Sequence, residues 1–205
     1  MDRGEWISLT KIGEPTPYCA SDEERRLVES ALGGDYSAFD TLVDRHWRKV
    51  ASVAGRFLQD PNEAEDVVQE TFIRAFEGLK SFRGQAGFQT WLIRIAINQC
   101  KNRQQTWWKR RVLLHEPQQP PVQKGSHHPG GETIVLQDEK ARAVQSAVQQ
   151  LPEKYRLPIM LHYFEEMTGA EVAAVLGWNE SLVWSRIYSG YRELRKRLTE
   201  WKENG

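Results

Sequence analysis

The sequence predicts an all-α protein with two small helical domains joined by a flexible linker. Apolar residues recur at helical spacing on both sides of residues 112–137, and no alternating apolar and polar run is long enough for a sheet. The stretch between the two domains is rich in proline and glycine, which neither helix nor strand tolerates. The expected units are an N-terminal arm over 1–21, a first helical domain over 22–111, a linker over 112–137 and a second helical domain over 138–202.

The composition excludes several classes of protein. The chain has 205 residues, of which 40% are apolar and 27% are charged, so it can bury a core. Its longest unbroken apolar run, residues 172–176, is far shorter than the ~20 residues that cross a membrane. The N-terminus has no signal-peptide pattern, and Cys19 and Cys100 have no paired spacing. We therefore expect a cytoplasmic protein without a membrane span, a disulfide framework or a cysteine zinc site.

Capping and turn residues divide the first domain into helices. Ser21 and Glu24 have the spacing of a capping box, and residues 33–35 (GGD) interrupt the helix that begins there. A second helix passes through Phe39 and ends near Gln59. The remaining helices should cover about 62–79 and 88–109, after loops at 60–62 and 84–87. The expected buried stripe of the third helix is Val68, Phe72, Ala75, Phe76 and Leu79.

The second domain has its own helix boundaries. Pro158 lies inside one expected helix and should bend it, and Gly177 should form the turn before the last helix. The expected helices cover residues 134–150, 151 to about 164, 168–176 and about 180–201.

Charge is segregated along the chain, although Lys+Arg and Asp+Glu each number 28. Residues 22–77 hold 7 basic and 13 acidic groups, whereas residues 78–115 hold 8 basic groups and no acidic one. Residues 138–181 hold 4 and 7, and residues 182–205 hold 6 and 3. Two acidic-then-basic blocks favour two modules that each present one face to a polyanion such as nucleic acid. The alternative is a set of solvated helices that merely differ in charge.

The second domain carries the spacing of a helix-turn-helix. Counted from Gly169, a small residue stands at the fifth position (Ala173), glycine at the ninth (Gly177) and a β-branched residue at the fifteenth (Val183). A small fifth residue lets the two helices cross closely, and the second helix would lie in the DNA major groove. The alternative is an ordinary helical hairpin. The candidate DNA-binding residues are Ser181, Trp184, Ser185, Arg186, Tyr188, Ser189, Arg192, Arg195 and Lys196.

The helix that begins near Phe88 has two different faces. One face is apolar and consists of Leu92, Ile93, Ala96, Ile97 and Cys100. The other combines an aromatic ring, cations and amides, in Trp91, Arg94, Asn98, Lys101, Asn102 and Gln105. Cations suit phosphates, amides suit base edges and an aromatic plane suits an unstacked base, so this face predicts single-strand nucleic-acid contact. The alternative is a solvated face with one core tryptophan.

Aromatic and basic residues also flank this helix without any carboxylate. Phe82, Arg83 and Phe88 surround the glycine loop ahead of it, and residues 107–111 (WWKRR) follow it. By contrast, the helix over 62–79 should present an outward face that repels DNA and meets a protein or water. That face consists of Asp66, Gln69, Glu70, Ile73 and Glu77.

Enzymatic chemistry finds little support in the sequence. An enzyme needs convergent nucleophile, acid/base or metal-binding groups, but the five histidines are scattered and no glycine-rich phosphate loop of the Walker type occurs. The adjacent pair His127 and His128 has no third ligand nearby, so it is a weak metal signal. We expect no catalytic residue, no metal and no cofactor.

Three segments together resemble a known family. They are AEDVVQETFIRAF (64–76), FRGQAGFQTWLIRIAINQCKNR (82–103) and LPEKYRLPIMLHYFEEMTGAEVAAVLGW (151–178). In this order they are similar to the extracytoplasmic-function (ECF) sigma factors of bacteria, in the sigma-70 family. The resemblance implies a domain 2 that binds the β′ clamp helices of core RNA polymerase and opens the minus-ten promoter element. It also implies a domain 4 that binds the minus-thirty-five element and the β flap, and an anti-sigma partner.

The resemblance assigns roles residue by residue. Phe72 falls in the polymerase-binding motif but is expected to be mainly core. The other polymerase-binding residues implied are Asp66, Gln69, Glu70 and Ile73. The implied minus-ten residues are Phe82, Arg83, Phe88, Thr90, Trp91, Arg94, Asn98, Lys101 and Asn102. The helix-turn-helix residues named above would bind the minus-thirty-five element.

The chain departs from the family pattern in two places. Trp184 and Ser189 stand where the family commonly has basic residues, so apolar contacts of Trp184 and Tyr188 with thymine methyls become an alternative. The arm over 1–21 exceeds the family core and is read as a tail, an anti-sigma contact or a redox element using Cys19. The rival function is a helix-turn-helix DNA-binding regulator whose N-terminal bundle senses a ligand or binds another protein.

Overall fold

A computed structural model of the chain describes residues 22–58, 60–113, 144 and 146–203. Every regular element within these ranges is helical, as the sequence predicts, and none is a strand. The N-terminal helical group consists of α1 (Asp22–Leu32), α2 (Tyr36–Phe57), α3 (Pro61–Gly78), η2 (Leu79–Ser81) and α4 (Phe88–Leu113). The C-terminal helical group consists of α6 (Glu153–Ile159), η3 (Met160–Phe164), α7 (Gly169–Leu176) and α8 (Glu180–Glu203), preceded by a helical stretch at residues 146–149.

Two aspartates set the starts of α2 and α3. The Asp35 carboxylate accepts hydrogen bonds from the backbone amides of Ser37 and Ala38. The hydroxyls of Ser37 and Ser30 also donate to it, and these hydroxyl bonds together with the Ala38 amide hold the pKa of Asp35 below its ordinary value. Asp60 caps α3 in the same way, with Pro61 at the first helical position, where a missing N–H costs nothing. The predicted break at 33–35 and turn at 60–62 are thus confirmed, while the predicted cap Ser21 lies outside the described residues.

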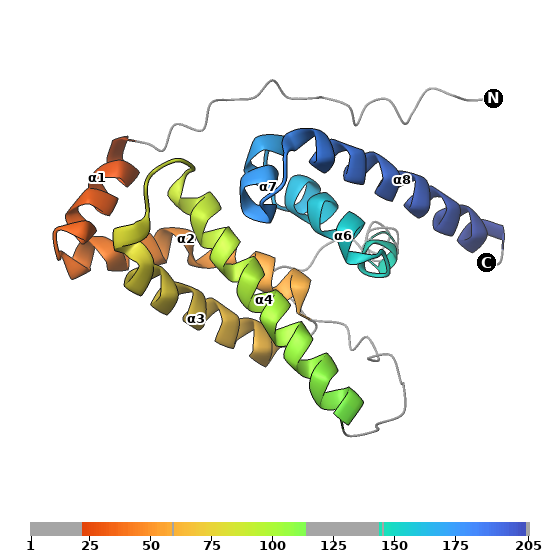
Figure 1. Ribbon diagram of the computed structural model, residues 1–205, viewed down its shortest axis with the longest axis horizontal. Coiled ribbons are helices and arrows are strands. Elements are labelled where there is room, and N and C mark those ends of the chain that lie inside the picture. Colours follow the sequence, from red (N-terminus) through yellow and green to blue (C-terminus); the bar gives the residue numbers. More distant parts are fainter. Residues whose placement is uncertain (1–21, 59, 114–143, 145, 204–205) are drawn as a thin grey trace, which may run out of the picture.

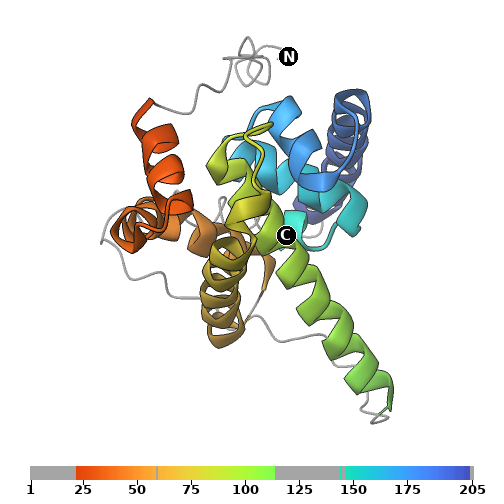
Figure 2. The same ribbon diagram turned by 60° about the vertical axis from the view of Figure 1, so that its left-hand side comes forward.

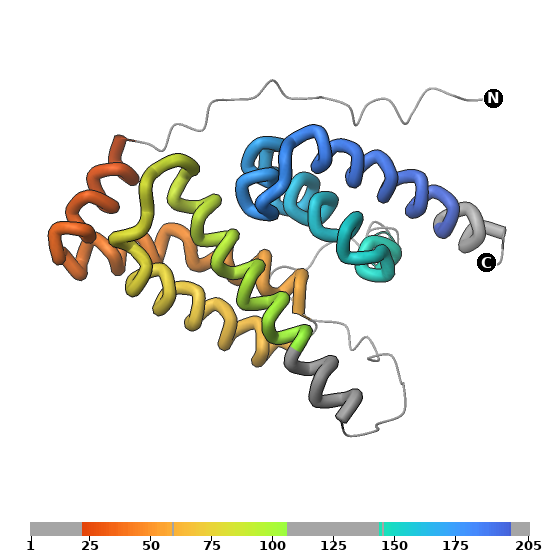
Figure 3. The backbone as a smooth tube through the Cα atoms, viewed as in Figure 1, coloured from red at the N-terminus to blue at the C-terminus, as the bar shows by residue number. Residues whose placement is uncertain are grey.

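The core of the N-terminal group forms where α2, α3 and α4 pack against one another. Figure 3 shows the backbone reversing after α3, so that α4 returns beside it. The predicted apolar face of α4 is buried: Leu92, Ile93, Ala96, Ile97 and Cys100 are each at most 1% exposed. The expectation for Phe76 was wrong, because its ring is 44% exposed and packs edge-on against Phe39 beside Tyr36.

In the C-terminal group, the helix that holds Pro158 changes its winding. Proline donates no backbone hydrogen bond, and α6 gives way to the π-helical turn η3 directly after Ile159. The predicted distortion is therefore present as a change of helix type. Of the predicted helix over 134–150, only residues 144 and 146–149 are described, and they are helical.

The two groups pack against each other. α7 lies beside α4 (Figures 1 and 2), and the buried apolar residues of both groups form one continuous cluster. The sequence predicted separate domains but gave no indication of this contact. The predicted linker and arm lie mostly outside the described residues.

Candidate protein and nucleic-acid interfaces

The exposed side of α3 carries carboxylates together with the apolar residues Ile73 and Phe76. Ile73 is 54% exposed among carboxylate and amide side chains. Glu70 accepts a hydrogen bond from Arg74 Nε at 2.6 Å, and Asp66 lies 3.2 Å from Arg103 Nη1 on α4. The predicted residues that the structure brings together on this face are Asp66, Gln69, Glu70 and Ile73.

The inward face of α3 holds that surface rigid. Phe72 is 6% exposed, as expected for a mainly structural residue, and its ring stacks on Trp47 of α2 with a centroid distance of 5.6 Å. Val67 and Val68 are buried beside it. Because these contacts fix α3 along its length, its outward side chains project from a regular helix and not from a loop.

An aromatic cluster lies where the loop after η2 enters α4. The rings of Phe82, Phe88 and Trp91 lie 5.2–5.6 Å apart in pairs, with Phe88 only 1% exposed. Phe82 and Trp91 are half-buried, so their free edges form the surface and Phe88 supports them from below. Trp91 also packs over Gly78, which leaves room for the indole.

Thr90 lies between Phe88 and Trp91 in the first turn of α4. It is 2% exposed, and its hydroxyl oxygen has no hydrogen-bond partner. An unpaired buried hydroxyl costs free energy that a bound polar group would recover. Arg83 is exposed in the loop beside the cluster, and the adjacent Gly84 has φ 67°, a left-handed conformation that glycine adopts without strain.

The polar face of α4 continues from this cluster. Arg94, Asn98 and Asn102 are exposed at one-turn spacing, as the sequence predicts. Lys101 is half-buried, because its ammonium group lies 3.7 Å from the Glu153 carboxylate of α6. The C-terminal group therefore already engages one predicted DNA-binding cation.

The helix-turn-helix geometry of α7 and α8 is confirmed. Gly177 has φ 69°, Ala173 is 8% exposed at the crossing and Val183 is fully buried. A capping box between Thr168 and Glu171 fixes the start of α7. These contacts orient α8 so that one side remains open to a ligand.

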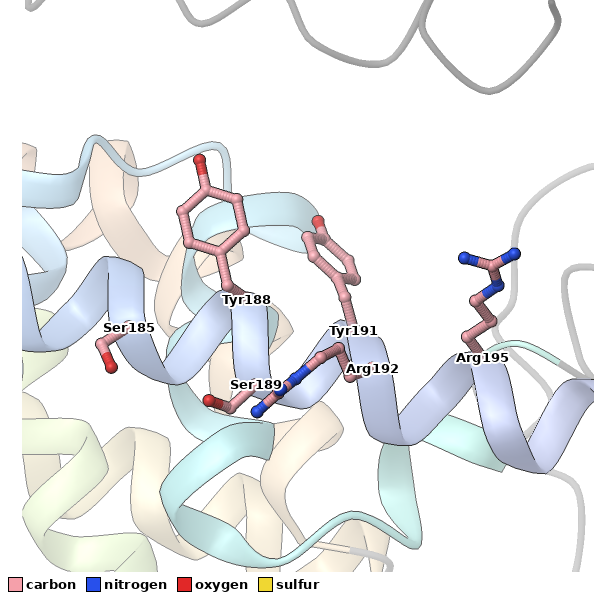
Figure 4. Close-up of a pocket in the computed structure, with 6 residues that line it drawn as sticks. All are labelled: Ser185, Tyr188, Ser189, Tyr191, Arg192 and Arg195. Carbon is pink, nitrogen blue, oxygen red and sulfur yellow. The ribbon is translucent and has the colours of Figure 1, made fainter. Parts of the chain in front are cut away.

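The open side of α8 forms a shallow hollow of about 630 Å³ (Figure 4). Tyr188 projects from it and is 61% exposed. Two arginines extend the same surface toward the end of the helix, which gives it a positive charge. The lining residues are Ser185, Tyr188, Ser189, Tyr191, Arg192 and Arg195. Ser181 and Lys196 are also exposed, whereas Arg186 is half-buried with its guanidinium 6.0 Å from the Tyr155 ring.

Trp184 lies partly inside the domain. Its indole fits against Gly169 so closely that a Cβ there would meet the ring at 2.9 Å. Its Nε1 donates to Glu180 at 3.3 Å, and its ring lies edge-on to His162. The aromatic residue that α8 presents freely is therefore Tyr188.

Tyr191 and Tyr163 complete this surface, although neither is among the DNA-binding residues predicted from the sequence. Their rings pack edge to face at 5.4 Å, and burial raises the pKa of Tyr191, so its hydroxyl remains protonated and able to donate. The spacing of Tyr191 three residues after Tyr188 was the available signal.

Other kinds of site are absent from the part of the chain that the structure describes. No cluster of three or more His, Cys, Asp or Glu residues there is arranged to hold a metal ion. No helix among the described residues is long and apolar enough to span a membrane.

Two family models match the chain in the regions of these surfaces. Sigma-70 region 2 matches residues 42–110, which include α3 and the described face of α4, and Sigma-70, region 4 matches residues 141–194. The RNA polymerase sigma-H factor of Pseudomonas aeruginosa is 34% identical over 191 residues, covering 86% of this chain and 94% of that protein. The chain belongs to the ECF sigma factors of the sigma-70 family.

Other relatives agree with this assignment. The ECF RNA polymerase sigma-E factor of Escherichia coli K12 is 34% identical over 176 residues, covering 79% of this chain and 87% of that protein. The solved structure of CnrH in complex with the cytosolic domain of CnrY has a TM-score of 0.63 at 28% identity, covering 87% and 99% of the two chains. RpoE in complex with the anti-sigma factor NepR from Bartonella quintana has a TM-score of 0.62 at 21% identity, covering 78% and 96%, and shows the shared fold.

As an alternative sigma factor, this protein binds core RNA polymerase and promoter DNA and directs transcription initiation. The two basic surfaces and the acidic surface described above are the regions where these partners are to be sought.

Proposed function

We propose that this ECF sigma factor divides its work among three helices: α3 binds the β′ clamp helices, α4 reads and opens the minus-ten element, and α8 reads the minus-thirty-five element. The observation that carries the proposal is the segregation of exposed charge. The outward face of α3 carries Asp66 and Glu70 around Ile73, whereas α4 and α8 expose amides, arginines and aromatic edges.

The α3 surface suits a protein partner. Carboxylates repel DNA, and an exposed isoleucine among them gains free energy when a partner removes it from water. Gln69 lies beside Ile73 on the same outward face and supplies both a donor and an acceptor. This face lies opposite the Phe72 anchor, so binding need not disturb the core.

The α4 surface suits a separated DNA strand. A base that leaves the stack costs a few kcal/mol, which an aromatic and polar pocket must offset. Phe82 and Trp91 offer ring edges, and Thr90, which precedes Trp91 in α4, has a buried hydroxyl without a hydrogen-bond partner. Asn98 and Arg94 lie further along α4, where an amide and a cation reach a base edge and a phosphate. Melting driven by such binding needs no nucleotide hydrolysis.

The α8 surface suits a duplex major groove. Arg192, Arg195 and Lys196 extend beyond the helix-turn-helix, where phosphate contacts position the helix. Tyr188 and Ser185 are closer to the start of α8, where base edges are read in this motif. Tyr188 has the shape for apolar contact with a thymine methyl, and Trp184 supports the helix from behind.

Further properties follow from the proposed role. We expect the protein to act in the bacterial cytoplasm, to catalyse no reaction of its own and to require no metal or cofactor. CnrH and RpoE were solved with CnrY and the anti-sigma factor NepR, and we expect a comparable anti-sigma partner here.

The decisive experiment is run-off transcription with purified core polymerase on promoters selected by binding. Asp66→Lys with Glu70→Lys should abolish core capture, whereas Asn98→Ala should leave capture intact and lower open-complex formation about tenfold. Asp44→Lys, an exposed charge reversal on α2, is the matched control. If the wild-type chain neither captures core nor initiates at any selected promoter, the proposal fails. If Asn98→Ala lowered core binding as much as open-complex formation, the assignment of separate roles to α3 and α4 would be contradicted.

A further inference from the structure

Three tyrosines form a cluster beside the hollow of α8. Tyr188 and Tyr191 project from the same side of α8 (Figure 4), and they are 61% and 36% exposed. Tyr163 comes from η3, is 44% exposed and packs its ring edge to face on Tyr191 at a centroid distance of 5.4 Å. A residue from a different element therefore continues the surface that α8 offers to DNA.

The histidine before Tyr163 fixes its position. The His162 imidazole lies edge-on to the Tyr163 ring at 4.6 Å and edge-on to the Trp184 ring at 5.0 Å. Its Nδ1 lies 2.6 Å from the carbonyl oxygen of Met167, and this contact holds the imidazole in place. Tyr163 thus projects from a braced π-helical turn, and turns of this kind are frequent at functional sites.

η3 runs along one flank of α8. The two α8 residues that contact it, Trp184 and Tyr191, are seven residues apart and so lie on one side of the helix. Ser185 and Arg192 follow them by one residue each, which places the lining of the hollow about 100° further round the helix. A helix is about 10–12 Å wide and the major groove is about 12 Å wide, so a helix in the groove has phosphates along its flanks. When the hollow faces the base edges, η3 therefore faces a wall of phosphates.

The charge around the cluster favours DNA over a protein partner. Arg192 and Arg195 line the hollow, and none of the lining residues found in the described part of the chain is acidic. A polyanion is attracted by this positive field, whereas an apolar partner surface would bury the arginines without compensation.

The hydroxyl of Tyr163 has a proton to donate outward. Burial and a hydrogen bond with Tyr163 raise the pKa of Tyr191, as expected where the Tyr191 hydroxyl is the donor. A phenol hydroxyl both accepts and donates, so Tyr163 accepts from Tyr191 and keeps its own proton for another partner. Hydrogen bonds in such a chain strengthen one another, and a phosphate oxygen is a strong, charged acceptor.

We propose that Tyr163 donates a hydrogen bond from η3 to a phosphate on the wall of the major groove and thereby helps to set the register of α8 on the minus-thirty-five element. This inference rests on the proposed role of α8. Tyr163 is then a DNA-binding residue outside the recognition helix, and Tyr191 is its positioning residue. Because Tyr163 is uncharged, the contact adds affinity without releasing a further counterion.

The test replaces tyrosine with phenylalanine, which keeps the ring packing and removes only the hydroxyl. The full-length chain, alone and bound to core polymerase, is titrated by fluorescence anisotropy onto duplexes selected from random sequence by the wild-type chain. Tyr163→Phe should weaken binding about tenfold on every selected duplex and leave the slope of log K against log salt unchanged. Tyr191→Phe should lose less, and the double variant should bind no more weakly than Tyr163→Phe. Tyr36→Phe, which removes an exposed hydroxyl from α2, is the matched control and should bind as wild type.

A second measurement locates the phosphate. Each phosphate of one selected duplex is replaced in turn by an uncharged methylphosphonate. One replacement beside the bound site should weaken wild-type binding and have little effect on Tyr163→Phe. A merely structural role would lower binding to every replaced duplex by the same factor and would also lower the free energy of unfolding in urea.

Three results would overturn the contact. Tyr163→Phe could bind DNA as wild type, it could lose affinity with the methylphosphonate pattern unchanged, or its loss could be confined to one base sequence. A variant that binds DNA normally but captures less core polymerase would assign the cluster to a protein partner instead. Failure of the proposed function is read separately from Arg192→Ala: if this variant also binds DNA as wild type, α8 does not lie on the DNA, whereas a loss in Arg192→Ala alone keeps α8 there without Tyr163.

Discussion

The Nε2 atom of His46 lies 2.7 Å from the Glu24 carboxylate, and both residues are buried, at 4% and 6% exposure. The contact joins α1 to α2, and the imidazole also lies 5.6 Å from the ring of Phe88. Phe88 supports the aromatic cluster at the start of α4. A polar contact in the core thus lies directly beneath the proposed minus-ten surface.

Removing one partner of this pair should destabilise the protein strongly. Glu24→Ala leaves His46 buried without its carboxylate, so the free energy of unfolding should fall by about 3 kcal/mol in urea titrations. Glu23→Ala is the matched control, because its 2.7 Å contact with Arg45 is exposed and should contribute less than about 1 kcal/mol. Similar losses of unfolding free energy in the two variants would show that the buried contact contributes no more to stability than the exposed one.

The turn of the helix-turn-helix should require glycine for its backbone. Gly177 has φ 69° and open space around the position of a Cβ, so Gly177→Ala is opposed by conformation and not by a clash. Its cost should be about 1–2 kcal/mol, measured as a fall in unfolding free energy by circular dichroism. Gly177→Asn should lose less, since asparagine tolerates the left-handed region better. Equal losses of unfolding free energy in the two variants would indicate that packing, and not backbone conformation, requires glycine here.

The Cys100 thiol should resist modification and make stability depend on alkaline pH. Burial raises its pKa from 9.0 to about 12, so the thiolate is about a thousandfold rarer than in a free thiol near pH 8. In a Cys19→Ser chain, disulfide-exchange reagents should react only after urea unfolding. Because the folded pKa is raised, this contribution to stability is complete below pH 9 and declines as pH rises toward 12. Rapid labelling of the native chain at pH 8 would contradict the burial.

Two cations at the end of α8 should set the salt dependence of duplex binding. Arg192→Ala with Lys196→Ala should weaken binding to mixed-sequence duplexes evenly and lower the slope of log K against log salt by about 2. Arg197 is a poor choice for this test, because it contacts the Gln150 carbonyl and Glu193 within the fold. Fluorescence anisotropy of the full chain at several salt concentrations measures the slope. An unchanged slope would show that this end of α8 does not contact the DNA.

Periodicity and capping were enough to predict the helices. The apolar faces of α3 and α4 are formed by neighbours three and four residues apart. Asp35 and Asp60 cap nearby backbone amides with their own side chains, and Gly177 turns the chain through its own backbone conformation. Phe76 is the exception, because periodicity places it on the buried stripe whereas its ring is 44% exposed beside Phe39 and Tyr36 of α2.

Contacts between distant parts of the chain were beyond the sequence pattern. Glu165 read as one of two adjacent acidic residues, and nothing local distinguishes it from Glu166; only docking onto Lys49 and Arg56, more than 100 residues earlier, makes it a buried group. Trp184 likewise read as an outward residue of α8. Its place inside the domain depends on the missing side chain of Gly169 across the turn.

The close packing of the Trp184 indole against Gly169 limits how this factor can be redirected to new genes. Libraries that vary Ser185, Tyr188 and Ser189 change only side chains on the open side of α8, so the scaffold should tolerate them. Randomising Trp184 would instead remove the indole that packs against Gly169. Selection would then enrich variants that still fold, and not variants with a new DNA specificity. Engineers of orthogonal gene circuits should therefore keep the tryptophan and its glycine together as a fixed pair.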